Sequence, residues 1–339
     1  MNTNQQNISL SVVVPCYNVE RYLDRSLGCL ERQWNGRTDY EIILVNDAST
    51  DRTIDKLNEF KKRHPDNVTV IDKKVNEGAA MARNSGLDAA SGKWVVFLDP
   101  DDALVDNGYG SLLELTRGDE FDILSFGAKV VEEPDWNDAM TSAPLSGLRI
   151  EGVESSQDYM LNNHYGTCIK FFFKRELIGN QRFKPLVFLE DVVFVLPIFL
   201  SDAKVAFTEE NIYFYVLRTS STTNMIDAKR LTRGCDDVMT ALKCMDQIKQ
   251  GKSQAVQERI TVRQNFYAYN LFTRLMLSNK TTAEIRQARQ ELQALGLLPF
   301  NGSGLKPMLY NFLCRHLGAM AMFRPVYRLI RTLRSKFIH

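Results

Sequence analysis

The sequence lacks the signals that mark exported and membrane-spanning chains. The amino-terminal stretch MNTNQQN has no basic segment and no apolar core, so it is not predicted to be a signal peptide. The longest strongly apolar run, residues 192–200, is too short to cross a bilayer. The six cysteines form no C-x-x-C pair and have no metal-ligand spacing, as expected for reduced thiols. These absences predict a cytoplasmic protein.

Two common nucleotide-binding motifs are also absent. A dinucleotide-binding domain would have G-x-G-x-x-G after its first strand, whereas this chain has Pro15-Cys16-Tyr17-Asn18 at that point. The chain also has no P-loop lysine motif. NAD binding of the usual kind and P-loop phosphate binding are therefore not expected.

Acidic residues are absent after Glu291, although the whole chain is almost neutral. With 44% hydrophobic residues, 24% charged residues and a net charge of +1, the 339-residue chain has a soluble globular composition that indicates no nucleic-acid partner. The first 291 residues carry a net charge of −6. The cations that follow are Lys306, Arg315, Arg324, Arg328, Arg331, Arg334 and Lys336. A basic tail thus follows a mildly acidic body.

Short apolar segments alternate with helical patterns through the first hundred residues. Strands are predicted at residues 8–15, 40–45, 68–71 and 94–98. Helices are predicted at residues 21–33, from the Ser49-Thr50-Asp51 cap to Arg63, and at residues 79–89, where small residues would pack closely on a sheet. Alternation of this kind predicts a parallel, doubly wound sheet with right-handed crossovers.

The pattern changes in the rest of the chain. Further strands are predicted at residues 122–128, 165–173, 205–208 and 212–217, with a loop or lid at residues 131–157. From residue 227 onward the pattern is helical.

Three carboxylates follow the apolar strand at residues 94–98. Asp99, Asp101 and Asp102 lie around Pro100, which ends the strand at the carboxyl edge of the predicted sheet, where ligands bind in such folds. Carboxylates this close repel unless one takes a proton or a cation lies between them. Hard oxygen ligands suit Mg²⁺ or Mn²⁺, so the turn predicts a metal-diphosphate site. The alternative is a proline turn whose acids cap the next helix.

A second acidic pair interrupts the apolar segment at residues 183–200. Glu190 and Asp191 are predicted in the first turn of a buried helix. Adjacent helical positions project about 100° apart, so the two acids are expected to have different jobs. Burial in apolar surroundings raises a carboxylate pKa toward the range of a general base. Alternatively, both acids only cap the helix and interact with its dipole.

Four ordered blocks of the sequence resemble family 2 glycosyltransferases with the GT-A fold. The blocks are VVVPCYNVERYLDRSL, EIILVNDASTDRT, NEGAAMARNSGLDAASGKWVVFLDPDD and FLEDVVF, and the resemblance covers residues 8–220. It implies an α/β, Rossmann-like, mostly parallel sheet flanked by helices, with a helical C-terminal extension. Residues 8–130 would be the nucleotide-sugar-binding half, residues 131–225 the acceptor-binding half with the lid loop, and residues 226–339 the extension.

The resemblance implies roles for residues that follow the predicted strands. Those expected at the nucleotide base are Pro15, Tyr17, Asn18 and Asp47. Those expected to frame the nucleotide and its sugar phosphate are Asn76, Gly78, Ala82 and Arg83. Arg83 would contact phosphate, or would instead be a surface arginine of its helix. The family more often has a second Asp and a Gly where this chain has Asn46 and Ala48, so the base-side contacts can differ.

The same resemblance assigns the acids. Asp99 and Asp101 match the D-x-D element, with Asp101 the direct ligand of Mn²⁺ or Mg²⁺ and Asp99 nearer the ribose or sugar. Asp191 matches the catalytic base, and Glu190 would support its position or the acceptor. Arg218 is a weaker candidate for closure over the diphosphate. His164 has no assigned role, and Tyr213 and Tyr215 are expected to pack in the sheet.

The predicted function is inverting transfer of a sugar from a nucleoside-diphosphate sugar, by family habit a UDP-sugar, to a hydroxyl of a glycan or lipid-linked acceptor. Bacterial cell-surface polysaccharide synthesis is the implied setting. One alternative is a catalytically silent nucleotide-sugar-binding or scaffold protein. Another is a sugar-phosphate nucleotidyltransferase, which would need a Gly-rich loop with Arg and Lys after the first strand, and this chain has none.

The last predicted helix is basic and amphipathic. Its apolar residues recur at helical spacing while its arginines lie between them: the apolar set is Met322, Val326, Leu329, Ile330, Leu333 and Phe337, and the arginines are Arg324, Arg328, Arg331 and Arg334. Such a helix can make peripheral contact with the anionic inner face of a membrane. It can equally pack on the protein with its arginines solvated.

Overall fold

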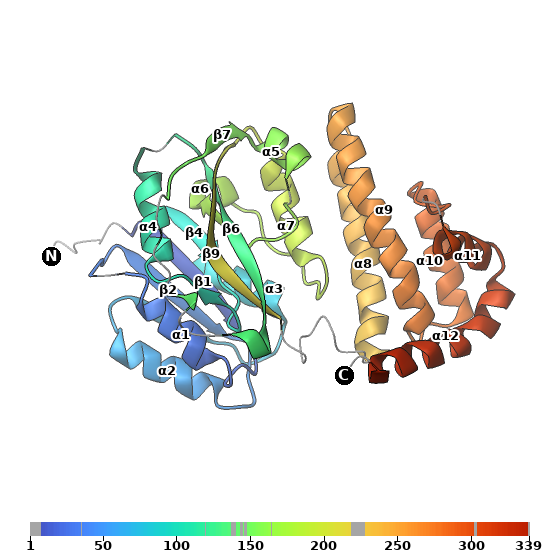
Figure 1. The fold of residues 1–339 in the computed structure, drawn as a ribbon, viewed down its shortest axis with the longest axis horizontal. Helices are drawn as coiled ribbons and strands as arrows, with labels where there is room; N and C mark the ends of the chain where they lie inside the picture. The colour runs from blue at the N-terminus through green and yellow to red at the C-terminus, as the bar shows by residue number, and fades with distance from the viewer. Residues whose placement is uncertain are drawn as a thin grey trace. The chain divides into compact units, whose positions relative to one another are not determined.

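The computed structural model describes residues 8–34, 36–118, 120–136, 140–142, 145, 148–163, 165–217, 228–301 and 304–337. The chain divides into two compact units, Met1–Thr223 and Asn224–His339. Each is considered by itself. In the described residues the first unit holds one nine-stranded sheet with flanking helices, and the second is helical (Figure 1).

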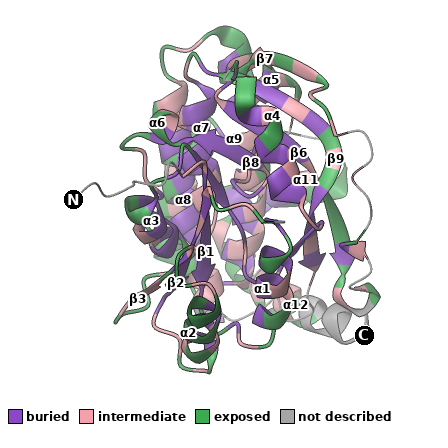
Figure 2. Ribbon diagram, turned by 90° about the vertical axis from the view of Figure 1, so that its left-hand side faces the viewer, coloured by how far each residue is buried: buried purple, intermediate pink, exposed green. Residues whose placement is uncertain are grey.

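Four parallel strands form the first half of the sheet. They are β1 (Leu10–Cys16), β2 (Tyr40–Asn46), β3 (Val68–Asp72) and β4 (Trp94–Phe97), in the spatial order β3-β2-β1-β4. The helices between them are α1 (Leu23–Glu31), α2 (Thr53–Arg63) and α3 (Ala79–Ala89). In Figure 2, α3 lies on one side of β1 and β2 and α1 lies on the other. The predicted doubly wound, parallel layer is confirmed in this half.

Continuous apolar runs explain why β1 and β4 lie in the interior of the whole sheet. Every residue of β4 is at most 1% exposed, and β1 is buried along its whole length. Helix α3 packs against β1 and β2 through its small residues. A Cβ atom at Gly86 would lie only 2.3 Å from Val13 Cγ1, so the helix approaches the sheet as closely as its glycine allows. This packing fixes where the ends of β1 and β4 lie.

The second half of the sheet is mixed. Its strands are β5 (Ala103–Leu104), β6 (Ile123–Glu132), β7 (Gly152–Ser155), β8 (Phe171–Lys174) and β9 (Lys204–Leu217). Strand β6 is parallel to β9 and antiparallel to β8, which also pairs antiparallel with β4. The helices of this half are α4 (Gly108–Leu115), α5 (Ser156–Asn162), α6 (Arg175–Ile178) and α7 (Glu190–Phe199).

Three sequence predictions in this half are wrong in detail. The two strands expected at residues 205–208 and 212–217 are one strand, β9, because the polar residues between them are absorbed where the register with β6 shifts. The strand expected at residues 165–173 begins only at Phe171. Part of the loop expected at residues 131–157 forms β7, and several of its other residues lie outside the described ranges.

The second unit consists of five helices in its described residues. They are α8 (Ala228–Lys249), α9 (Gln254–Leu277), α10 (Thr282–Ala294), α11 (Leu305–Arg315) and α12 (Leu317–Phe337). A capping box between Thr281 and Glu284 starts α10. Within the described part of the chain, no helix is both long enough and apolar enough to span a membrane. The predicted helical C-terminal region is confirmed.

Candidate active site

The acidic turn after β4 is held in place by a buried carboxylate. Asp102 is 1% exposed; its Oδ2 accepts a hydrogen bond from the Tyr213 hydroxyl (2.6 Å) and its Oδ1 accepts one from Val216 N (2.8 Å). The Tyr213 hydroxyl in turn accepts a hydrogen bond from Asp99 N (3.2 Å). Burial, followed by the neighbouring Asp101 and Asp99, raises the pKa of Asp102 well above its ordinary value. Asp102 and Tyr213 therefore tie the turn to β9.

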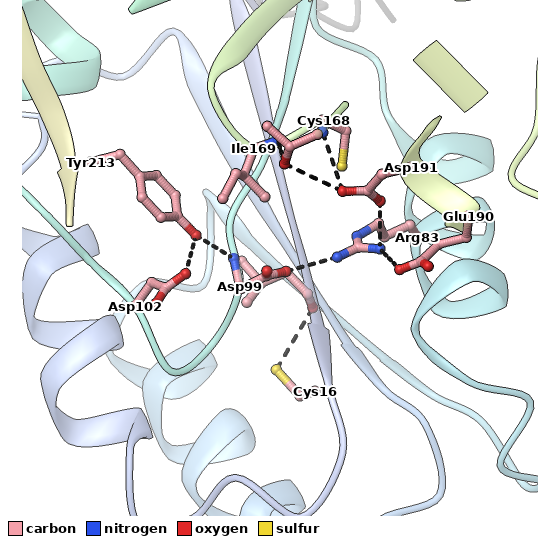
Figure 3. Close-up of polar contacts among 11 residues, drawn as sticks. Cys16, Arg83, Asp99, Asp102, Cys168, Ile169, Glu190, Asp191 and Tyr213 are labelled. Carbon is pink, nitrogen blue, oxygen red and sulfur yellow. Dashed lines mark hydrogen bonds and ion pairs between the residues drawn. The ribbon is translucent and has the colours of Figure 1, made fainter. Parts of the chain in front are cut away.

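Arg83 of α3 joins this turn to the second acidic pair. Its Nη2 lies 2.8 Å from Asp99 Oδ1, and its Nη1 lies 3.2 Å from both Glu190 Oε1 and Asp191 Oδ1. Figure 3 shows the guanidinium between Asp99 on one side and Glu190 and Asp191 on the other. Arg83 is 4% exposed and also lies over the Phe183 ring, 5.5 Å from its centroid. The alternative of a surface arginine is therefore wrong, and the contact with phosphate stays a prediction.

Glu190 and Asp191 begin α7, as the sequence predicts. The residue before them, Leu189, has a left-handed backbone (φ 65°) that turns the chain into the helix. Although adjacent helical side chains diverge, both carboxylates reach the same nitrogen of Arg83. They still differ in their other partners, because Asp191 Oδ2 also accepts hydrogen bonds from Cys168 N (3.2 Å) and Thr167 Oγ1 (3.3 Å).

One cation therefore faces three carboxyl groups. Burial would lower the pKa of Arg83, but Asp191, Asp99 and Glu190 outweigh that effect and raise it well above its ordinary value. Burial and the neighbouring Asp191 raise the pKa of Glu190 to about 7, even though Arg83 opposes the shift. A proton on Glu190 reduces the excess negative charge of the cluster. Asp191 is the acid held by three donors, which are Arg83 Nη1, Thr167 Oγ1 and Cys168 N.

The end of β2 is organised by Asp47. Its carboxylate is almost fully buried and accepts hydrogen bonds from Gly78 N (2.7 Å) and Glu77 N (3.2 Å), and Lys73 Nζ lies 3.0 Å from Oδ1. Gly78 precedes α3 with φ of +93°, which suits glycine. Asn76 Nδ2 donates to the Asp47 carbonyl oxygen (3.1 Å). Asp47, Asn76 and Gly78 are thus brought together at one edge of the sheet.

The remaining residues expected at the nucleotide differ in exposure. Tyr17 is 46% exposed at the end of β1, whereas Pro15 and Ala82 are buried. Asn18 Oδ1 accepts a hydrogen bond from Thr50 N (2.8 Å), so it joins the β1 and β2 turns. Ala48 has φ of 56°, which explains the glycine more common at this place in the family. A ligand could touch Tyr17 directly, whereas Pro15 and Ala82 shape the edge by packing.

The predicted metal site depends on which carboxylates of the acidic turn can bind a metal ion. Among the residues described, no three His, Cys, Asp or Glu side chains are grouped so as to hold a metal ion. Asp102 is committed to β9 and one Asp99 oxygen to Arg83, while Asp99 and Asp101 keep partial exposure at the edge. Two carboxylates completed by diphosphate oxygens match how Mg²⁺ is usually bound. The residues present therefore fit a metal held jointly with a substrate.

Several residues of this site were not predicted as such. Tyr213 was expected only to pack in the sheet, and its burial confirms that, but a buried tyrosine hydroxyl needs a polar partner, which here is the acidic turn. Thr167 and Cys168 gave no signal in the sequence. Arg25 donates to the Asp101 carbonyl oxygen. Arg218 and His164 lie outside the described residues.

Comparison with known proteins identifies the family. Residues 11–180 match the family model described as Glycosyl transferase family 2. The chain belongs to glycosyl transferase family 2. The matched residues include the acidic turn, Arg83 and the ends of β1 and β2, and the match ends before Glu190.

Curated relatives of this family 2 chain align with about two thirds of it. The minor teichoic acid biosynthesis protein GgaB of Bacillus subtilis is 31% identical over 232 residues, which are 68% of this chain and 25% of the relative. YibD of Escherichia coli, an uncharacterized glycosyltransferase, is 28% identical over 64% of this chain and 63% of its own length. A poly(ribitol-phosphate) beta-glucosyltransferase of Bacillus spizizenii is 26% identical over 70% and 37%. The chain thus spans less than two thirds of each relative.

Solved structures share the fold over nearly the whole chain. S. aureus TarS residues 1–349 in complex with UDP-GlcNAc has a TM-score of 0.65 and 18% identity, covering 96% of this chain and 92% of that 1–349 chain. The mannosyltransferase PcManGT of Pyrobaculum calidifontis in complex with GDP-Man and Mn²⁺ has a TM-score of 0.55 and 17% identity, covering 98% and 86%. At these identities the likeness shows the fold, and it confirms the predicted α/β GT-A architecture.

Proposed function

We propose that this family 2 protein transfers a sugar from a UDP-sugar to an acceptor hydroxyl, with inversion at the anomeric carbon, in the synthesis of a cell-surface polymer. Family membership supports the reaction class. The polymer and the nucleotide are supported by relatives named for teichoic acid and poly(ribitol phosphate) and by the TarS complexes with UDP and UDP-GlcNAc. The acceptor is a glycan or lipid-linked molecule at the inner face of the membrane.

The observation that carries the proposal is the Arg83 cluster. One guanidinium contacts Asp99 of the D-P-D-D turn and both acids that begin α7, all within 3.2 Å. A nucleotide-sugar site and a catalytic base must lie side by side for transfer to occur. Arg83 brings together two acidic motifs that are about ninety residues apart in the sequence.

The donor would lie along the edge formed by the ends of β1, β2 and β4. In this proposal the base is bordered by Pro15, Tyr17, Asn18 and Asp47. The ribose and sugar phosphate are bordered by Asn76, Gly78, Ala82 and Asp99. Tyr17 is exposed enough to contact the base directly. Asp47 acts at least in part by holding the loop before α3, since its oxygens already accept hydrogen bonds from Glu77 N and Gly78 N.

Asp101 and Asp99 would hold Mn²⁺ or Mg²⁺ together with the diphosphate. When bound, such an ion neutralises charge on the diphosphate leaving group and orients it. The chain's own contribution is the fixed turn, which Asp102 and Tyr213 hold against β9.

Asp191 would be the catalytic base. The acceptor hydroxyl oxygen forms a bond to the anomeric carbon, the bond from that carbon to the diphosphate oxygen breaks, and UDP leaves with the electron pair. Asp191 takes the hydroxyl proton. Cys168 N, Thr167 Oγ1 and Arg83 hold the Asp191 carboxylate in one orientation, and Glu190 beside it keeps a proton up to about pH 7.

Turnover of the Asp191→Asn variant tests the assignment. UDP release from UDP-GlcNAc with poly(ribitol phosphate) as acceptor should fall by on the order of a thousandfold, while UDP binding measured by calorimetry stays near the wild-type value. Asp202→Asn, which changes an exposed aspartate, is the matched control and should retain full activity. Wild-type turnover in Asp191→Asn would refute the base assignment.

The same assay separates the alternatives. A silent nucleotide-sugar-binding or scaffold protein would bind UDP without any turnover that depends on Asp191. A sugar-phosphate nucleotidyltransferase would release pyrophosphate from a nucleoside triphosphate and a sugar phosphate. The residues at the end of β1, Pro15-Cys16-Tyr17-Asn18, offer no glycine-rich cationic loop for that reaction.

A further inference from the structure

Helix α11 exposes its apolar face. Four of its side chains follow the i, i+3, i+4, i+7 spacing of a single helical face and are well exposed: Leu305 (87%), Met308 (66%), Leu309 (38%) and Phe312 (51%). The opposite face, with Tyr310, Leu313 and Cys314, is buried in the second unit. A helix that is apolar on both faces is expected where a second surface covers it.

Helix α12 also exposes apolar side chains. Met322 (81%), Val326 (50%) and Leu329 (60%) lie on its exposed face. Its arginines point the other way: Arg324 Nη1 donates to Lys280 O (2.8 Å) and Arg328 Nη2 donates to Ser278 O. These two arginines therefore bind the carbonyl groups just after α9, and the expected set of solvated arginines is wrong for both.

The two faces of α12 therefore differ in their surroundings. The arginine face packs on the protein, whereas the apolar face remains open. The side chains of Ile330, Arg331, Leu333, Arg334 and Phe337 lie outside those that the structure describes.

Charge indicates what covers this surface. Arg315 of α11 is exposed beside the apolar stripe, whereas the Lys306 ammonium lies over the rings of Tyr269 and Tyr310, 5.0 and 5.5 Å from their centroids. The sequence has no Asp or Glu after Glu291. A second copy of the chain, meeting the same surface by twofold symmetry, would bring like charges together. An anionic lipid surface instead offers both an apolar layer and complementary charge.

We propose that the exposed faces of α11 and α12 dock on an anionic membrane. Leu305, Met308, Phe312 and Met322 enter the boundary between headgroups and acyl chains, and Arg315 contacts the phosphates. The helices lie in the plane of the membrane surface and do not cross it. This proposal concerns the second unit and does not depend on the reaction proposed for the first.

Co-sedimentation with vesicles tests the docking surface directly. The full chain is mixed with vesicles of phosphatidylglycerol and phosphatidylcholine, or of phosphatidylcholine alone. We expect binding to the anionic vesicles at least tenfold tighter than to the neutral ones, and several-fold weaker in 0.5 M than in 0.1 M NaCl, because salt screens the headgroup charge (about 10 Å Debye length at 0.1 M, less at higher salt).

A matched pair of double variants locates the contact. Met308→Ser/Phe312→Ser changes two exposed apolar side chains one turn apart on α11, and Val262→Ser/Phe266→Ser changes two of similar exposure (64% and 58%) one turn apart on α9. The α11 pair should weaken vesicle binding by on the order of tenfold or more, and the α9 pair should leave it unchanged. Circular dichroism and urea unfolding confirm that both variants are folded.

Three results would overturn the proposal. They are equal binding to anionic and neutral vesicles, equal loss of binding in the α9 and α11 variants, and no vesicle binding by the folded wild type. In the last case, a dimer seen by sedimentation velocity and lost in Met308→Ser/Phe312→Ser would assign the surface to a second copy of the chain.

Discussion

Two helical arginines, one in each unit of the chain, have different kinds of partner in the structure. Arg83, in the first unit, is bound by the carboxylates of Asp99, Glu190 and Asp191. Arg324, in the second unit, is bound by the backbone carbonyls of Met276, Ser278 and Lys280 at the end of α9. A helix C-terminus leaves carbonyl groups that need donors, so the Arg324 contacts follow from the fold alone.

No such need explains the Arg83 contacts. The fold does not require three acids around one buried cation, because a buried ion pair often contributes little net stability compared with apolar packing. Three carboxyl groups around one buried cation therefore indicate a catalytic or binding role. The comparison therefore predicts that changing Arg83 affects activity beyond its effect on folding, whereas changing Arg324 affects folding only.

The largest effect is expected from Arg83→Met. Removing the cation leaves the buried acids without their partner, at a cost of about 3–5 kcal/mol in the free energy of unfolding. It also frees Asp99 and Asp191 to move, so turnover per folded molecule should fall by about a hundredfold or more. Denaturant unfolding and UDP release measure the two effects separately.

Arg83→Lys sharpens this test, because lysine keeps the charge but cannot reach both acidic motifs with a planar fork. It should recover much of the stability and little of the turnover. Full turnover in Arg83→Lys would show that Arg83 supplies only charge.

Glu190 should make stability depend on pH. Its pKa is raised from 4.5 to about 7 in the folded protein, so between these values the folded state keeps a proton that the unfolded chain releases. Stability from this group is therefore fully present below pH 4.5 and is lost as the pH rises to 7, by at most about 3 kcal/mol. In Glu190→Gln this part of the decline should disappear, as measured by urea unfolding at pH 5 and pH 7.5.

Tyr213→Phe should weaken the acidic turn. It removes the donor to buried Asp102 and the acceptor for Asp99 N, at a cost of about 1–3 kcal/mol. UDP affinity in the presence of Mn²⁺ should fall more than the maximal turnover rate. The control is Tyr109→Phe, since the Tyr109 hydroxyl is buried without a hydrogen-bond partner among the described residues, and its loss should be neutral or stabilising. Equal effects of the two changes would remove the special role of Tyr213.

The smallest effect is expected from Arg324→Met. It removes charge-assisted hydrogen bonds at the end of α9, at a cost of about 1 kcal/mol. Turnover per folded molecule should equal that of the wild type. A loss of turnover as large as that of Arg83→Met would break the comparison between the two arginines.

Local patterns predicted much of this structure. The buried strands, the acids at the end of β4 and the helix that begins at Glu190 all follow from short stretches of sequence, because apolar runs, proline and carboxylates act over a few residues. The resemblance added the order of the motifs and the family, which the comparisons confirm.

Contacts between distant segments could not be predicted in the same way. Arg83 looks like any helical arginine until the fold brings it to the carboxylates of Glu190 and Asp191, which lie 107 and 108 positions further along the chain. Tyr213 looks like a packing residue until β9 lies across the acidic turn. The two faces of α12 could be separated from the sequence, but which one packs on α9 depends on carbonyl groups that no side-chain pattern reveals.

The most direct measurement is a calorimetric titration of UDP into the folded wild-type protein, with Mn²⁺ and then with EDTA. The account predicts saturable binding that needs the metal and is lost or strongly weakened in Asp101→Asn. A folded protein that binds no UDP under either condition, or binds it equally well with EDTA and in Asp101→Asn, would contradict the nucleotide-sugar site at the edge of the sheet.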